Sequence, residues 1–157
     1  MTVSGIALLS GVLGIVLVTK AIHGYIRKTN KLTGLVVKNE QLMLLMAQWM
    51  ENKRKNKRIE SFFEKNGFET IAIYGMSYLG ECLYEELKGS ESVRVDYAID
   101  KNPVNTTDLR ICNPDGDLDE VDAIVVTAVY YFDEIADVLW EKVDCPIVSL
   151  EDVIRSI

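Results

Sequence analysis

The stretch at residues 71–80, IAIYGMSYLG, decides the fold class of this chain. A strand-like apolar run enters a turn of the pattern Gly-x-Ser-x-x-Gly, and an amphipathic helix pattern follows over residues 81–87. A second strand-like run, residues 93–99, ends at the acidic residue Asp100, 20 residues after the last Gly of the turn. This succession of strand, turn, helix and strand is typical of a dinucleotide-binding unit.

The rest of the C-terminal part alternates in the same way between strand and helix patterns. Residues 123–129, AIVVTAV, form an almost wholly apolar run of the kind found in a buried central strand of a parallel sheet. Strands separated by helices indicate a parallel sheet with right-handed crossovers. We therefore predict an α/β fold, a small doubly wound, Rossmann-like sheet of about five strands. The other predicted elements are strands at 70–74, 109–112 and 146–149 and helices at 133–142 and 150–157.

The turn supplies the candidate ligand-binding residues. In a dinucleotide-binding turn the first Gly permits a tight exit from the strand, the last allows close packing of helix on sheet, and the middle position approaches the pyrophosphate. The middle position here is Ser77, whose side chain either crowds a phosphate or donates a hydrogen bond to it. Asp100 is suited to accept hydrogen bonds from ribose hydroxyls and disfavours a 2′-phosphate. The candidate set is Gly75, Met76, Ser77, Tyr78, Leu79, Gly80, Asp100, Lys101 and Thr127.

Two interpretations of this turn stay open. Backbone N–H groups and the dipole at the start of the helix favour a bound anion. The same glycines also serve a sheet that uses the turn for helix packing alone. Met76, Tyr78 and Leu79 either cover a ligand or pack against the body.

No catalytic set can be assembled from the sequence. The single histidine, His23, lies far from the predicted sheet, so no Ser-His-Asp or Cys-His set exists. The cysteines Cys82, Cys112 and Cys145 show no CxxC spacing, which indicates reduced thiols rather than disulfides or a zinc site. We predict no metal site, and the catalytic residues, if there are any, stay unknown.

The charge is strongly asymmetric. Residues 20–65 hold 11 Lys and Arg against 4 Asp and Glu, whereas residues 66–157 hold 6 against 20. The acidic C-terminal part would repel a phosphate backbone, so we predict no nucleic-acid partner.

The N-terminus predicts a single membrane anchor over residues 1–22. Residues 3–19 carry no charge, and Lys20 and Arg27 are among the cations that follow. The positive-inside rule then places the C-terminal domain in the cytoplasm, attached to the cell membrane by one span. The alternative is a buried helix of a soluble protein.

Between anchor and domain we predict a basic helical connector over residues 23–66, followed by the Rossmann-like domain at 67–157. One apolar helix face is either core or a surface for a partner helix or self-association. Five cations among residues 53–58 either form a solvated face or contact anionic lipid. The members of the apolar face are Leu42, Leu45, Met46, Trp49 and Met50.

Four segments carry a family resemblance: IAIYGMSYLGECLYEELK at 71–88, YAIDKNP at 97–103, VDAIVVTAVYYFDEI at 121–135 and CPIVSLEDVI at 145–154. They resemble a small Rossmann-like module of bacterial surface-polysaccharide gene clusters, which is similar to the N-terminal domain of sugar O-acyltransferases. The chain departs from that pattern at Ser77, where Gly is frequent, and in carrying its own anchor.

The resemblance implies a role in nucleotide-sugar or polysaccharide metabolism. The expected function is a membrane-anchored module that binds a nucleotide or nucleotide sugar and serves a polysaccharide-biosynthesis enzyme such as a glycosyltransferase. The alternative is a minimal NAD-dependent oxidoreductase or sugar epimerase completed by a partner chain. The expected cofactor is accordingly NAD or a nucleotide sugar, and the oligomeric state stays open.

Overall fold

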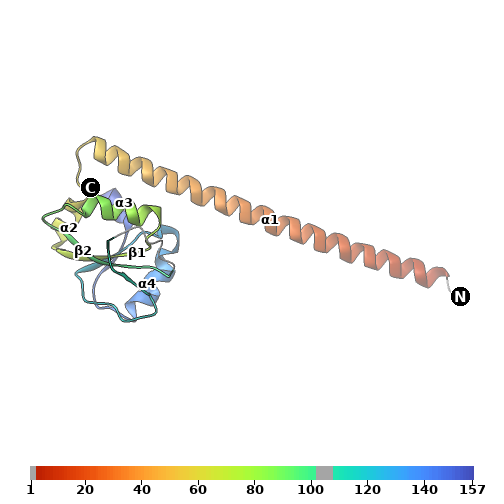
Figure 1. Ribbon diagram of the computed structural model, residues 1–157. Coiled ribbons are helices and arrows are strands. Elements are labelled where there is room, and N and C mark those ends of the chain that lie inside the picture. The colour runs from red at the N-terminus through yellow and green to blue at the C-terminus, as the bar shows by residue number, and fades with distance from the viewer. Residues whose placement is uncertain (1–2, 102–107) are drawn as a thin grey trace. The chain divides into compact units, whose positions relative to one another are not determined.

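A computed structural model describes residues 3–101 and 108–157 of the chain, with side chains described from residue 18 onward within those ranges. The chain divides into two compact units, Met1–Leu44 and Leu45–Ile157. Helix α1 (Val3–Arg54) supplies the described part of the N-terminal unit and the first residues of the C-terminal unit (Figure 1).

The N-terminal unit is helical as far as it is described. Within the described part of the chain, no helix is both long and apolar enough to cross a membrane. The predicted anchor spans residues 1–22, and the side chains of residues 1–17 lie outside the described part. The anchor therefore stays a prediction.

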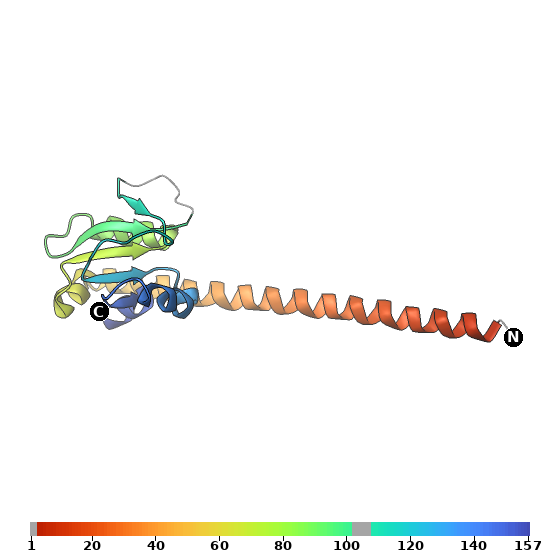
Figure 2. The same ribbon diagram turned by 90° about the horizontal axis from the view of Figure 1, so that it is seen from below.

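The C-terminal unit, hereafter the body, is a five-stranded sheet with helices α3 and α4 on opposite faces (Figures 1 and 2). The strand order is β3-β2-β1-β4-β5, and all neighbouring strands pair in parallel. This order confirms the predicted doubly wound parallel sheet. After α1 the elements are α2 (Glu60–Asn66), β1 (Thr70–Tyr74), α3 (Tyr78–Leu87), β2 (Arg94–Ile99), β3 (Ile111–Cys112), β4 (Ala123–Val126), the 3-10 helix η1 (Val129–Tyr131), α4 (Phe132–Trp140), β5 (Ile147–Ser149) and α5 (Leu150–Ser156).

The sheet reverses its direction of growth between β1 and β4. From β1 the chain adds β2 and β3 on one side and then returns to add β4 and β5 on the other. Such a switch point separates the loops at the carboxyl ends of the two central strands, and ligands of open α/β sheets bind in the crevice that results.

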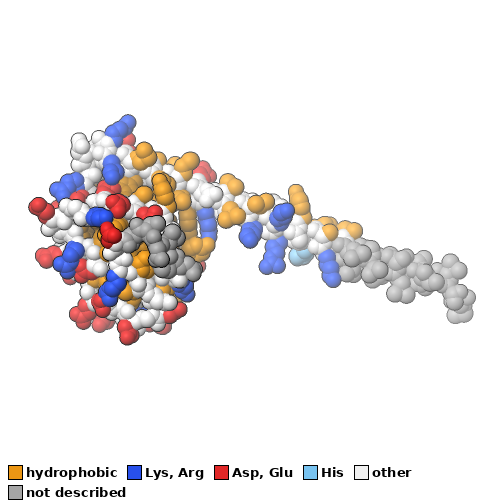
Figure 3. Space-filling view, viewed as in Figure 1, with side chains coloured by type: hydrophobic (Ala, Val, Ile, Leu, Met, Phe, Trp, Pro, Cys, Tyr) orange, Lys and Arg blue, Asp and Glu red, His pale blue; other side chains and the backbone are white. Residues whose placement is uncertain are grey.

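Acidic side chains are spread over the visible face of the body (Figure 3).

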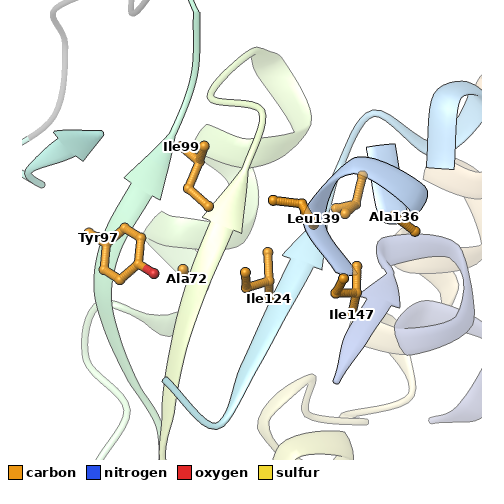
Figure 4. Close-up of a cluster of buried hydrophobic side chains, with 8 residues drawn as sticks. Ala72, Tyr97, Ile99, Ile124, Ala136, Leu139 and Ile147 are labelled. Carbon is orange, nitrogen blue, oxygen red and sulfur yellow. The ribbon is translucent and has the colours of Figure 1, made fainter. Parts of the chain in front are cut away.

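The core consists of apolar residues on both faces of the central strands. On one face Ala72 and Ile124 pack with Leu139 of α4 (Figure 4). The alternate residues of β1, Ile71 and Ile73, are fully buried on the other face, toward α3. All four residues of β4 are buried, as the apolar run predicts for a central strand.

Two predicted boundaries were wrong at the edge of the sheet. Helix α3 begins at Tyr78 rather than at residue 81, because Ser77 is already its N-cap, in an extended conformation with ψ of −168°. Strand β4 ends at Val126 rather than at residue 129, because η1 follows before α4 begins. The connection from β1 to α3 is therefore residues 75–77, and the connection from β4 to η1 is residues 127–128.

The end of the connector belongs to the body. Leu45 and Trp49 are each only 6% exposed, and the buried Asn52 donates from Nδ2 to the carbonyl oxygen of Ile154 over 2.7 Å. Met50, by contrast, is 71% exposed. The predicted apolar face therefore divides between core residues and surface residues. Helix α2 ends at Asn66, and its cap Gly67, with a left-handed φ of 70°, accounts for the predicted end of the connector at residue 66.

One carboxylate fixes the start of β1 and gives a pH-dependent prediction. Oδ2 of Asp122 accepts hydrogen bonds from the backbone N–H groups of Thr70 and Glu69, at 2.7 and 2.9 Å, and from the Thr70 hydroxyl at 2.9 Å. These hydrogen bonds lower the pKa of Asp122 below its ordinary value of 3.8, and those from Thr70 have the largest effect. A lowered folded-state pKa adds stability above the unfolded-state pKa, and that stability is lost as the pH falls through the folded-state value.

Asp122→Asn is therefore expected to be less stable than the parent chain at pH 7, with the difference shrinking as the pH falls below about 4. Urea unfolding at a series of pH values measures this difference. Asp117→Asn removes the same charge from an exposed position and serves as the control. A pH-independent difference between Asp122→Asn and the parent would contradict the assignment.

Candidate functional site

The site is built around the turn that leaves β1. Gly75 has a φ of 93°, a conformation that residues with side chains rarely adopt. Its N–H donates to the carbonyl oxygen of Ile99 over 2.8 Å, so the first residue of the turn is held by the end of β2. A Cβ atom at Gly75 would lie 2.9 Å from Oγ1 of Thr127. Gly75 thus gives the tight strand exit that a dinucleotide-type turn requires.

Gly80 brings α3 against the turn. A Cβ atom at this position would lie 2.1 Å from the carbonyl oxygen of Gly75, which is far inside van der Waals contact. The first turn of α3 can therefore pack on the strand exit only without a side chain here. The spacing of these two glycines has a direct steric cause.

Asp100 joins the end of β2 to the turn. Its Oδ2 accepts a hydrogen bond from the backbone N–H of Met76 over 2.7 Å. The acidic residue predicted from its distance in sequence thus lies beside the turn, as a ribose-binding carboxylate would. It also holds the turn in place, a contact that spacing alone does not reveal. A carboxylate has about four lone-pair sites in all.

Thr127 joins β4 to the same turn across the switch point. It is only 3% exposed, and its hydroxyl lies 2.6 Å from the carbonyl oxygen of Gly75 and 3.1 Å from that of Tyr74. Its backbone N–H also donates to Tyr74 over 2.9 Å. Thr127 is therefore a buried support of the turn, not a residue that lines an open surface.

The remaining predicted residues separate by burial. Met76 and Leu79 are 2% and 7% exposed, so they pack inside the body. Ser77 and Lys101 are exposed, and Ser77 makes no side-chain capping hydrogen bond to α3. Tyr78 is 66% exposed and, together with Leu79, borders a hollow of about 390 Å³ against the end of α1. The other residues of that hollow are Met46, Trp49, Met50, Lys53, Cys82, Glu85 and Glu86.

At the carboxyl edge of the sheet, the electrostatics favour an anion at the N-terminus of α3. Beyond β4 and β5 a hollow of about 330 Å³ is lined by five carboxylates, Asp133, Glu134, Asp137, Glu151 and Asp152. Negative charge of that density disfavours a phosphate. The N-terminus of α3 instead offers backbone N–H groups and the positive end of the helix dipole. A phosphate is therefore better accommodated at Ser77 than beyond β5.

Tyr74 is a residue of the site that sequence reasoning missed. Burial, and then the negative charges of Asp100 and Asp115, raise the pKa of its phenol. The negative charge of Asp115 thus acts on the phenol at the end of β1. The signal available in the sequence was only that Tyr74 is the last residue of the strand before Gly75.

The turn offers groups that can bind a ligand. Among the described residues, no group of three or more His, Cys, Asp or Glu side chains could hold a metal ion. The three cysteines are free and half-buried. The single histidine lies in α1, outside the body. The turn accordingly offers backbone donors, a serine hydroxyl and a carboxylate, which suit a phosphorylated, ribose-containing ligand.

Comparisons of this chain with protein-family models, with curated proteins and with solved structures find no match.

Proposed function

We propose that the body binds a nucleotide or nucleotide sugar at the carboxyl edge of its sheet, over residues 75–80. The observation that carries this proposal is the exposed N-terminus of α3 at the switch point, where neither Gly75 nor Gly80 adds a side chain between strand and helix. The phosphates contact the backbone N–H groups that follow Ser77, and the Ser77 hydroxyl donates to one of their oxygens. The ribose hydroxyls donate to Asp100.

The same arrangement sets a preference among cofactors. The Asp100 carboxylate repels a 2′-phosphate, so NAD binds in preference to NADP. A nucleotide sugar satisfies the same contacts with its diphosphate and ribose.

In the cell, this binding serves polysaccharide synthesis. The resemblance of residues 71–88 and 145–154 to the polysaccharide-cluster module supports this role, as does the binding chemistry of the turn. The chain acts as an accessory module, anchored in the cell membrane through residues 1–22, that holds a nucleotide sugar for an enzyme such as a glycosyltransferase.

A matched pair of variants at Ser77 tests ligand binding. Ser77→Asp places a negative charge where the phosphate is proposed to bind, and is expected to weaken binding at least about tenfold. Asp is also a favourable N-cap, so the melting temperature should stay equal or rise. Ser77→Asn has nearly the same shape without the charge and should retain most of the affinity.

The measurement is calorimetric titration of the full-length chain with NAD, NADP, CoA and several nucleotide sugars. Equal affinities for the Asp and Asn variants would exclude the turn as the phosphate site. If none of these ligands binds the parent chain, the proposed function is wrong and the turn serves helix packing alone.

A further inference from the structure

Helix α1 carries a regular apolar seam along its described N-terminal part. The large apolar side chains of this seam are between 52% and 74% exposed. The seam comprises Val18, Ile22, Tyr25, Leu32, Val36 and Met43. With Thr29 and Asn39 included, its members follow one another at alternating steps of four and three residues. That is the spacing of the core positions of a coiled coil, sustained here over more than three heptads.

Four of the five cations at residues 18–43 of the helix lie away from this seam. At about 100° per residue, Lys38 lies about 200° around the helix from Val36, and Lys20, Arg27 and Lys31 lie near the same side as Lys38. In Figure 3 the Lys and Arg side chains of the described part of the helix gather mainly along its lower edge, and hydrophobic side chains along its upper edge. Two such seams can therefore meet without bringing most of these positive charges together.

We propose that α1 pairs with α1 of a second copy of this chain, as a parallel, in-register, two-stranded coiled coil. A helix of this length needs packing of an apolar face, because helices gain little stability from propensity alone. The proposal is independent of the proposed nucleotide site, since the seam lies at residues 18–43 and the turn at 75–80.

The two polar members of the seam favour an identical, parallel partner. In a parallel, in-register pair, Asn39 meets Asn39 of the second copy, and an amide that both donates and accepts can pair with itself. Thr29 likewise meets its own counterpart. In an antiparallel pair centred on the seam, Asn39 would instead lie opposite the apolar end near Ile22, without a polar partner. The hydrocarbon region of a membrane, in which an apolar seam would lie, likewise offers Asn39 no hydrogen-bonding group.

Two adjacent valines provide a matched test of the seam. Val36 belongs to it and Val37 does not, although both are exposed, at 64% and 47%. In a lone chain Val36→Glu and Val37→Glu should behave alike. In the proposed dimer only Val36→Glu places two carboxylates face to face in the apolar interface.

The experiment is light scattering coupled to size-exclusion chromatography on the full-length chain in a mild non-ionic detergent. We expect about twice the chain mass of 17.7 kDa for the parent and for Val37→Glu, and the single-chain mass for Val36→Glu. A monomeric parent, or equal behaviour of the two variants, overturns the proposal. Binding of a monomeric parent to anionic vesicles, lost only in Val36→Glu, assigns the seam to lipid and overturns it as well.

Cysteine cross-linking tests the parallel register. With Cys82, Cys112 and Cys145 replaced by Ser, Ile22→Cys and Val36→Cys are each expected to give a covalent dimer on mild oxidation, whereas Lys38→Cys gives none. Only a parallel, in-register pair brings both seam positions against their own copies. Cross-linking at one seam position alone, or equal cross-linking at Lys38→Cys, excludes this arrangement.

Discussion

Gly80→Ala is expected to lower the free energy of unfolding of the body by about 3 kcal/mol, the upper end of the usual range for overpacking a closely packed site. The added Cβ atom would lie 2.1 Å from the carbonyl oxygen of Gly75, and that atom belongs to the backbone. It cannot rotate away as a flexible side chain would. Relief requires α3 to shift from the turn, which also strains the Asp100 bond to Met76.

Gly89→Ala is the matched control, because a Cβ atom at Gly89 meets nothing within 4 Å. This variant should stay within about 0.5 kcal/mol of the parent. Urea unfolding of both full-length variants, followed by circular dichroism, gives the comparison. If Gly80→Ala were as stable as Gly89→Ala, the close approach of α3 to the turn would be incorrect. The spacing between Gly75 and Gly80 would then have no steric reason.

The sequence was sufficient for the central elements of the fold. Strand β1 was predicted with its observed bounds, Thr70–Tyr74, because an apolar run is bounded there by Gly67 and by the glycine turn. The parallel arrangement followed from the alternation of strands and helices. Each of these predictions depends on residues near one another in sequence, where steric and periodic rules act directly.

The contacts that close the site could not be predicted in the same way. The Asp100 bond to Met76 joins residues 24 positions apart, and the Thr127 bond to Gly75 joins residues 52 positions apart. Sequence spacing placed Asp100 and Thr127 at the correct edge of the sheet. It did not show that both hold the turn together, because this depends on side-chain geometry. The predicted start of α3, residue 81, was also too far along the chain. Ser77 caps the helix through its backbone conformation, which the sequence does not reveal.

The extent of the body was the other unpredicted feature. The domain was expected over residues 67–157, whereas the compact unit begins at Leu45. Helical periodicity identifies an apolar face but not what packs against it. Leu45, Trp49 and Met50 were therefore equivalent in sequence. In the structure the first two are core residues and the third is exposed.

Trp49→Ala is expected to cost the body about 3 kcal/mol or more, since truncation of a buried Trp removes a large contact area and leaves a cavity. Trp49 is 6% exposed, and its indole Nε1 donates to Oε2 of Glu86 over 2.9 Å. The variant leaves that carboxylate, whose side chain is 13% exposed, with its ion pair to Lys53 at 3.0 Å. Loss of packing and of the indole donor therefore act in the same direction.

Met50→Ala is the control, because Met50 adjoins Trp49 in sequence and is 71% exposed. Its cost should stay below about 0.5 kcal/mol. Trp49→Phe keeps much of the packing without the N–H donor, so it should fall between the two. Urea unfolding of the three full-length variants measures these differences. Equal stability of Trp49→Ala and Met50→Ala would place the end of α1 outside the body, which would then begin at α2. The ordering expected here would instead establish the last turns of α1 as part of the sheet domain, so that a fragment starting at residue 67 would lack part of its own core.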